Sequence, residues 1–200
     1  SFGERGESQF AWKQAGVRLE DVKAQRREEA ERAAAVLGAE IEFFDAGDYP
    51  LRTTPEMLDR TIDIYRELQP SFVLSHALED PYNFDHPLAA HFAQEARIVA
   101  QAAGHKPDPA RAYSAPPVFL FEPHQPEQCN FKPNVILNID AVWETKRKAF
   151  EVLAAQKHLW EYYTRVALNR GVQGGRNSGR PMTYGEAYQR LFPEALEVLA

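Results

Sequence analysis

The chain has 200 residues in ordinary globular proportions, 44% hydrophobic and 26% charged, which is enough for one domain with its own core. Its net charge is −6 at pH 7, it has no long basic run, and no apolar stretch approaches the roughly eighteen residues that cross a membrane. We therefore expect neither nucleic acid nor a membrane as a partner, and the single cysteine, Cys129, favours a cytoplasmic protein without internal disulfides.

The first half of the chain predicts helices that alternate with short strands. Its expected elements are, in order, a loop over 1–18, a helix over 19–37, a strand over 41–44, a helix over 55–68, a strand over 72–75, a polar loop over 76–86 and a helix over 87–103. Gly38 is suited to end the first helix, and Thr54 followed by Pro55 is suited to begin the second.

The second half continues this alternation. Its expected elements are strands over 117–121 and 135–139, helices over 142–155 and 159–169, a glycine-rich loop over 171–179 and a last helix over 184–199. Such a pattern is typical of an α/β fold, with a mostly parallel sheet and helices on both faces, and the length predicts a single domain over 1–200. In these folds the site lies beyond the carboxyl ends of the strands, so chemistry is expected in the loops at 3–8, 76–86 and 122–129.

The loop at 76–86 carries a candidate metal ligand, His86, which Pro87 is expected to keep just outside the first helical turn. Neutral imidazole is a common metal ligand, and Asp85 or a nearby carbonyl could hold the second ring nitrogen. The alternative is a surface histidine that happens to precede proline, since one ligand does not make a metal site. His76, just past a strand, either enters the same site or packs beside it.

The other two loops carry acid–base candidates. Glu4 and Glu7 lie in a tight glycine loop, where a partly desolvated glutamate could act as base or acid, or could form an exposed acidic turn. His124 stands between two prolines that stiffen its loop, which is either a site of proton transfer or a proline-rich connector. Cys129 is expected to be a packed residue, because no activating partner is evident.

Three arginines, Arg170, Arg176 and Arg180, surround the expected glycine-rich loop. Arginine grips carboxylates in bidentate fashion, so this set favours a small acidic ligand. The alternative is a flexible surface segment with ordinary solubilising charge. The dense aromatic run at 158–163 predicts a core or a subunit interface first, and a pocket wall second.

Together these motifs resemble the LmbE-like, or PIG-L, family of zinc-dependent enzymes. Within it the chain is most similar to the hydratase branch that serves bacterial gallate and protocatechuate breakdown. The resemblance covers essentially the whole chain and is carried by residues 1–8, 43–50, 80–87, 121–129 and 158–173. It implies a Rossmann-like fold.

The resemblance also implies a site. One zinc ion per subunit would take His86 as a ligand, and the family's other two ligands, a His and an Asp after the first strand, would lie upstream of Ser1, so a βαβ unit is expected to precede this chain. Glu7 and His124 would form the acid–base pair, with the choice between Glu4 and Glu7 left open. The arginines would hold the carboxylates of a small polycarboxylate whose carbon–carbon double bond is hydrated, and the protein would be a homo-oligomer.

Two other functions fit parts of the sequence. A zinc-dependent N-acyl deacetylase of amino sugars shares the fold and the metal, although the three arginines suit a polycarboxylate better than a neutral sugar. A metal-free binding or assembly module would lack the metal, so metal content separates it from both enzymes.

Overall fold

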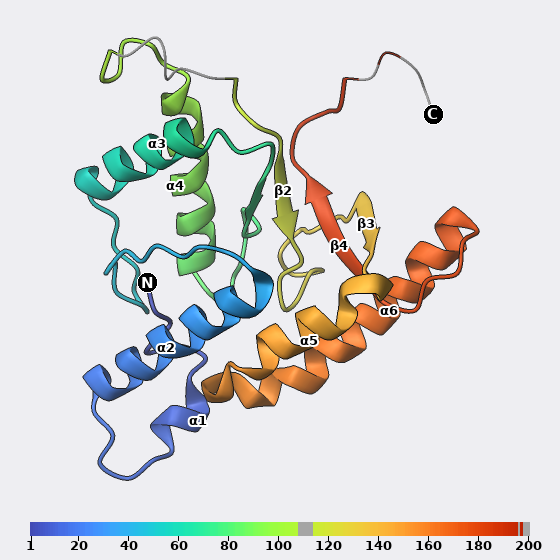
Figure 1. Ribbon diagram of the computed structural model, residues 1–200, viewed down its shortest axis with the longest axis horizontal. Helices are drawn as coiled ribbons and strands as arrows, with labels where there is room; N and C mark the ends of the chain where they lie inside the picture. The colour runs from blue at the N-terminus through green and yellow to red at the C-terminus, as the bar shows by residue number, and fades with distance from the viewer. Residues whose placement is uncertain (108–113, 196, 198–200) are drawn as a thin grey trace. The chain divides into compact units, whose positions relative to one another are not determined.

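The computed structural model describes residues 1–107, 114–195 and 197 (Figure 1). Within these residues the chain divides into two compact units. Unit 1 joins Ser1–Arg52 to Ile136–Glu186, and unit 2 joins Thr53–Val135 to the described part of Ala187–Ala200. Among the described residues, no helix has the length and apolarity needed to span a bilayer.

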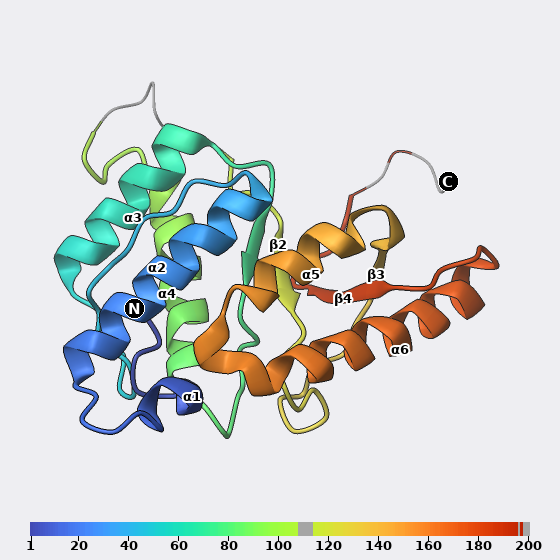
Figure 2. The same ribbon diagram turned by 60° about the horizontal axis from the view of Figure 1, so that its bottom comes forward.

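Unit 1 is mostly helical. Its elements are α1 (Gln9–Trp12), α2 (Leu19–Leu37), β3 (Val135–Asn138), the 3-10 turn η2 (Asp140–Val142), α5 (Trp143–Glu151), the 3-10 turn η3 (Ala154–Leu159) and α6 (Trp160–Ser178). α2 runs beside α5 (Figure 2) and ends at Gly38, whose φ of 67° confirms the predicted stop. A core of Ile139, Trp143 and Ala167 is closed by Tyr184, which stacks on Trp143 at 4.1 Å between ring centroids.

A buried polar network joins α2 to η3 in unit 1. Arg26 and Glu29 form an ion pair at 2.7 Å, and the Ala155 amide donates to the other Glu29 oxygen at 3.0 Å. Arg26 also donates to the Gln156 side chain and to the Phe2 carbonyl. Because both charges are satisfied by several partners, the network can fix the start of the chain and η3 against α2.

Unit 2 contains α3 (Pro55–Leu68), β1 (Val73–Ser75), α4 (Asp85–Ala100) and β2 (Val118–Phe121). α3 begins as predicted, with Pro55 in its first turn and the Thr54 hydroxyl accepting from the Met57 amide at 3.3 Å. The two helices pack through Ile62 and Tyr65 of α3 and Ala96 and Ala100 of α4 (Figure 1).

The strands confirm the α/β class but form a mixed sheet. The strand order is β1-β2-β4-β3, and β4 (Gly185–Arg190) passes from unit 1 into unit 2. β1 pairs with β2 in parallel, with Val73 opposite Val118, whereas β2 pairs with β4 antiparallel, with Phe119 opposite Arg190. The prediction of a mostly parallel sheet is therefore wrong for the described strands, because the last strand returns against β2.

The predicted glycine-rich loop over 171–179 is wrong, because α6 continues through it to Ser178. A Cβ at Gly171 would lie 2.0 Å from the Thr183 carbonyl oxygen, and one at Gly174 would lie 2.5 Å from the Met182 sulfur. The glycines therefore let the returning chain pack against the helix and do not make a flexible segment.

Two other expected elements are also wrong. The predicted last helix begins as β4, with Ala187 and Tyr188 buried, because pairing with β2 overrides local propensity; its positions 196 and 198–199 lie outside the described residues. Residues 41–44 form no strand, and Ile41 is 43% exposed, since a strand needs a paired neighbour.

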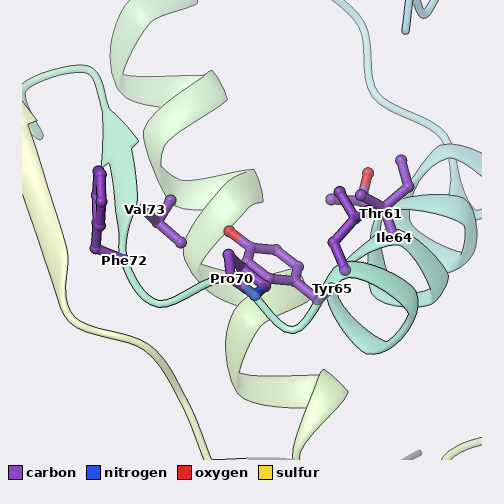
Figure 3. A pocket seen from close by; sticks show the side chains of 7 residues that line it. Thr61, Ile64, Tyr65, Pro70, Phe72 and Val73 are labelled. Carbon is purple, nitrogen blue, oxygen red and sulfur yellow. The ribbon is translucent and has the colours of Figure 1, made fainter. Parts of the chain in front are cut away.

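An apolar hollow of about 310 Å³ lies beside α3 in unit 2 (Figure 3). Its lining is Thr61, Ile64, Tyr65, Leu68, Pro70, Phe72 and Val73. It contains none of the candidate site residues and no carboxylate, histidine or arginine, so it does not offer acid–base or metal chemistry.

Candidate functional site

The imidazole of His86 is held at both ring nitrogens. Nδ1 lies 2.8 Å from Asp80 Oδ2, and Nε2 lies 2.9 Å from the Asn83 side-chain nitrogen. The Asn83 side-chain oxygen accepts from the Asp85 amide at 3.0 Å, which turns its NH₂ group toward His86. Nε2 therefore accepts, the proton stands on Nδ1, and the Nε2 lone pair is the one that could bind a metal.

Asp80, not the predicted Asp85 or a carbonyl, is the partner of His86. Asp80 is only 8% exposed, and its Oδ1 accepts from the amides of Tyr82 and Asn83 while Oδ2 holds the imidazole. The prediction that His86 lies outside the helix is also wrong, because α4 begins at Asp85. Proline is tolerated in the first turn, where its missing N–H has no helical partner, and the run Asp-Pro-Tyr-Asn is the turn signal that could have identified Asp80.

His76, at the end of β1, joins this cluster. Its ring stacks on His86 at 4.2 Å between centroids and meets Phe121 edge-on at 4.6 Å. Burial, and secondly the neighbouring His86, lower the pKa of His76 to about 4, against a smaller opposing effect of Asp80. His76 is therefore neutral near pH 7 and places no positive charge beside His86.

These residues fit one ligand of a metal site. A ligating histidine usually donates its second ring N–H to a carboxylate, which is the arrangement of His86 and Asp80. In the part of the chain that the structure describes, no group of three or more His, Cys, Asp or Glu side chains could hold a metal ion. His86 can thus supply one ligand, and the described residues do not complete the set.

His124 lies exposed on the loop that follows β2. The loop closes through bonds from the Cys129 amide to the Gln125 carbonyl and from the Phe131 amide to the Pro126 carbonyl. Cys129 is 4% exposed, and burial, then Asp80, raise the pKa of its thiol. The prediction that Cys129 is a packed residue is confirmed, while the role of His124 stays a prediction.

The glycine loop of unit 1 presents its two glutamates differently. One oxygen of Asp48 accepts from the amides of Arg5 and Gly6, at 2.6 and 2.8 Å, and so fixes the backbone between Glu4 and Glu7. Glu4 is 3% exposed, and its Oε2 has no hydrogen-bond partner among the described residues. The Glu7 side chain is 43% exposed, so only Glu7 is open to a ligand from solution.

Glu7 has a partner that the sequence analysis did not identify. Its Oε2 lies 3.2 Å from Nε2 of His158, the first residue of the aromatic run. Burial, then Tyr162 and the Glu7 carboxylate, raise the pKa of Tyr163 to about 12. Glu7 belongs to unit 1 and His124 to unit 2, so their pairing stays a prediction.

The three arginines lie on or just beyond α6 and not on a mobile loop. Arg170 and Arg176 are in the helix, and Arg180 follows the Gly179 cap. Six helical residues turn through about 240° beyond one full circle, so Arg170 and Arg176 point to sides about 120° apart. Arg170 donates to the Gln173 side chain, and Arg176 and Arg180 are exposed. The structure does not bring them together as one clamp.

Comparison with known proteins places this arrangement in a family. A family model described as GlcNAc-PI de-N-acetylase, PIG-L, matches residues 1–97. The 4-oxalmesaconate hydratase of Pseudomonas putida KT2440 is 56% identical over 204 residues, which cover 100% of this chain and 79% of the relative.

Solved structures agree. The crystal structure of GalB, the 4-carboxy-2-hydroxymuconate hydratase from Pseudomonas putida KT2440, superposes with a TM-score of 0.95 at 56% identity, over 100% of this chain and 85% of that one. N,N'-diacetylchitobiose deacetylase from Pyrococcus horikoshii superposes with a TM-score of 0.69 at 22% identity, over 92% of this chain and 70% of that one, which shows a shared fold. The chain belongs to the PIG-L, or LmbE-like, family.

Proposed function

We propose that this chain is a hydratase that adds water to a carbon–carbon double bond of 4-carboxy-2-hydroxymuconate or its keto tautomer, 4-oxalomesaconate, in gallate and protocatechuate breakdown. The observation that carries the proposal is 56% identity to a hydratase over the whole chain, with a TM-score of 0.95 to a hydratase structure. The deacetylase neighbour, at 22% identity, supports only the fold.

Glu7 and His124 are the proposed acid–base pair. Hydration joins the water oxygen to one alkene carbon and a proton to its neighbour, so one group must take a proton from water while another delivers one to carbon. Either residue can fill either role. The accessibility of Glu7, against the 3% exposure of Glu4, favours Glu7 as the glutamate that reaches substrate.

His86 is the proposed zinc ligand, and the PIG-L family is generally metal-dependent. Asp80 holds the proton on Nδ1, which keeps the Nε2 lone pair for the ion, and the neutral His76 ring does not repel it. When bound, a divalent ion supplies Lewis-acid stabilisation of enolate charge on the substrate oxygens.

The acidic substrate needs cationic partners. Arg170, Arg176 and Arg180 are the proposed ones, and because the first two lie on different sides of α6, each would meet a different carboxylate. We also propose a homo-oligomer working in the cytoplasm, in keeping with one reduced, buried thiol.

The test is an assay of the purified protein, loaded with zinc and then chelated, that follows loss of the dienol's ultraviolet absorbance. Zinc-dependent loss, with a product heavier by one water, supports the hydratase. An inert dienol together with acetate release from N-acetyl sugars would overturn it in favour of a deacetylase.

The residue assignment has its own test. Glu7→Gln should lower kcat by about 100-fold or more while the far-ultraviolet circular dichroism stays unchanged. Glu20→Gln, an exposed change on α2 in the same unit, is the matched control and should leave kcat unaltered. A Glu7→Gln enzyme of near-normal activity would remove Glu7 from the mechanism.

A further inference from the structure

Glu7 and His158 meet across 151 positions of sequence, on two segments of unit 1 that have no other need to approach at this point. Both side chains are partly exposed, 43% for Glu7 and 31% for His158. A charged pair at such exposure adds little to stability, because water screens it and two side chains must be ordered. Its value must therefore lie in what it does to the Glu7 carboxylate.

The imidazole is held in place before Glu7 reaches it. His158 lies in η3, which is tied to α2 by the bond from the Ala155 amide to the buried Glu29. The Phe10 ring stacks on the imidazole at 5.9 Å between centroids with an interplanar angle of 19°. The His158 ring is thus a fixed partner for a glutamate side chain that otherwise has three rotatable bonds.

The same buried network reaches the glycine loop. Arg26 donates to the Phe2 carbonyl on one side and to the Gln156 side chain on the other. The backbone ahead of Glu7 and the backbone ahead of His158 are therefore anchored to one guanidinium. This common anchor sets the separation of the two segments, and the 3.2 Å contact follows from it.

We propose that His158 is a positioning residue for Glu7: its Nε2–H donates to Glu7 Oε2 and leaves Oε1 to exchange the proton with water or substrate. The inference rests on the proposed role of Glu7 in hydration. A fixed base within reach of its proton acts far better than one that samples several rotamers, and a base oriented by a third group is a recurrent arrangement in enzymes.

Tyr163 completes the surroundings of the pair. Its raised pKa means that the phenol stays protonated near neutral pH, so it brings no second negative charge to compete for the His158 N–H. Lys157, next to His158, lies over the Trp160 ring, and Lys13 lies over Phe10.

The test combines single and double variants in the dienol assay. His158→Phe should lower kcat by about tenfold or more with little change in KM, since an orienting contact acts on the chemical step. His158→Gln, whose amide nitrogen can take the place of Nε2, should restore most of the lost rate. In a Glu7→Gln background, His158→Phe should cause no further loss.

A matched control is available in unit 2. His105 Nε2 lies 3.2 Å from Asp59 Oδ1, and the His105 side chain is 34% exposed, so its geometry copies that of His158. His105→Phe should leave kcat unchanged. Long-range ¹H–¹⁵N spectra add a readout without turnover: the His158 ring should carry its proton on Nε2, and its nitrogen shifts should move in Glu7→Gln.

The outcomes separate the two proposals. A Glu7→Gln enzyme with normal kcat overturns the assigned role of Glu7 and the inference with it. If Glu7→Gln inactivates but His158→Phe keeps kcat, or if the His158 proton stands on Nδ1, the inference alone is overturned. A loss in His158→Phe that His158→Gln does not relieve, in a variant that melts like the wild type, also overturns it.

Discussion

Asp80 organises the His86 cluster because its two oxygens do different things. Oδ1 closes the turn by accepting from the amides of Tyr82 and Asn83, and Oδ2 fixes the proton on the His86 Nδ1. The turn thus determines which imidazole nitrogen keeps a lone pair. The availability of His86 as a ligand is set by a carboxylate six residues earlier.

Asp80→Asn tests this at the scale of one proton. The amide oxygen of the new side chain can keep the turn, but its NH₂ group then faces the His86 Nδ1 and moves the imidazole proton to Nε2. Zinc affinity, measured by competition with a chromophoric chelator, should fall by about 10-fold to 100-fold. Asp59→Asn, beside His105, is the matched control, and equal zinc affinity of the wild type and Asp80→Asn would contradict the assignment.

The sequence identified His86 and Glu7 as candidates, but it did not identify their partners. Candidate residue types are visible in a motif, whereas a partner such as His158 lies 151 residues away and is found only when the chain is folded. The Asp80 contact was within local reach, because an Asp-Pro-x-Asn run favours a turn whose carboxylate can face the following helix.

At the scale of elements, boundaries were predicted where local chemistry decides them. Gly38 ends α2 in the left-handed conformation, and Thr54 caps α3, both as expected. The errors came where distant contacts decide. Gly171 reads as a breaker in the sequence, yet in the structure it is the point where the returning chain touches α6.

Gly171→Ala should therefore destabilise the fold, although alanine is the better helix former. The new methyl would meet the Thr183 carbonyl oxygen at 2.0 Å, and moving backbone costs more than the gain of about 1 kcal/mol in helix propensity. We expect a net loss of about 1 to 3 kcal/mol in the free energy of unfolding, measured by urea denaturation. Gly104→Ala, which meets nothing within 4 Å, should change it little; a Gly171→Ala protein as stable as the wild type would show that the contact is soft.

At the scale of the whole molecule, alternating helices and strands were enough to predict the α/β class. The direction of the last strand and the division into two units were not predictable in the same way. Unit 1 unites the first 52 residues with Ile136–Glu186, and β4 takes its direction from pairing with β2. Both depend on contacts between distant segments, which leave no period in the sequence.

Global stability should carry the mark of one buried phenol at high pH. Tyr65 is 7% exposed between α3 and α4, and its hydroxyl donates to the Ala93 carbonyl at 3.2 Å. Burial raises the pKa of Tyr65, with a smaller opposing effect of Arg97. Below the unfolded-state pKa of about 10, both states keep the proton and stability does not depend on this group; above it the unfolded state loses the proton first, so stability falls as pH rises through the folded-state pKa.

Tyr65→Phe should remove that fall. Near neutral pH the variant should be less stable by about 1 kcal/mol, because one hydrogen bond is lost. Urea midpoints recorded from about pH 8 to about pH 11 should then converge, since only the wild type has a buried proton to lose at this position. Tyr82→Phe makes the same chemical change at a residue that is 59% exposed and should leave the wild-type slope intact. If the wild type and Tyr65→Phe stay parallel across this range, the buried phenol does not govern alkaline stability.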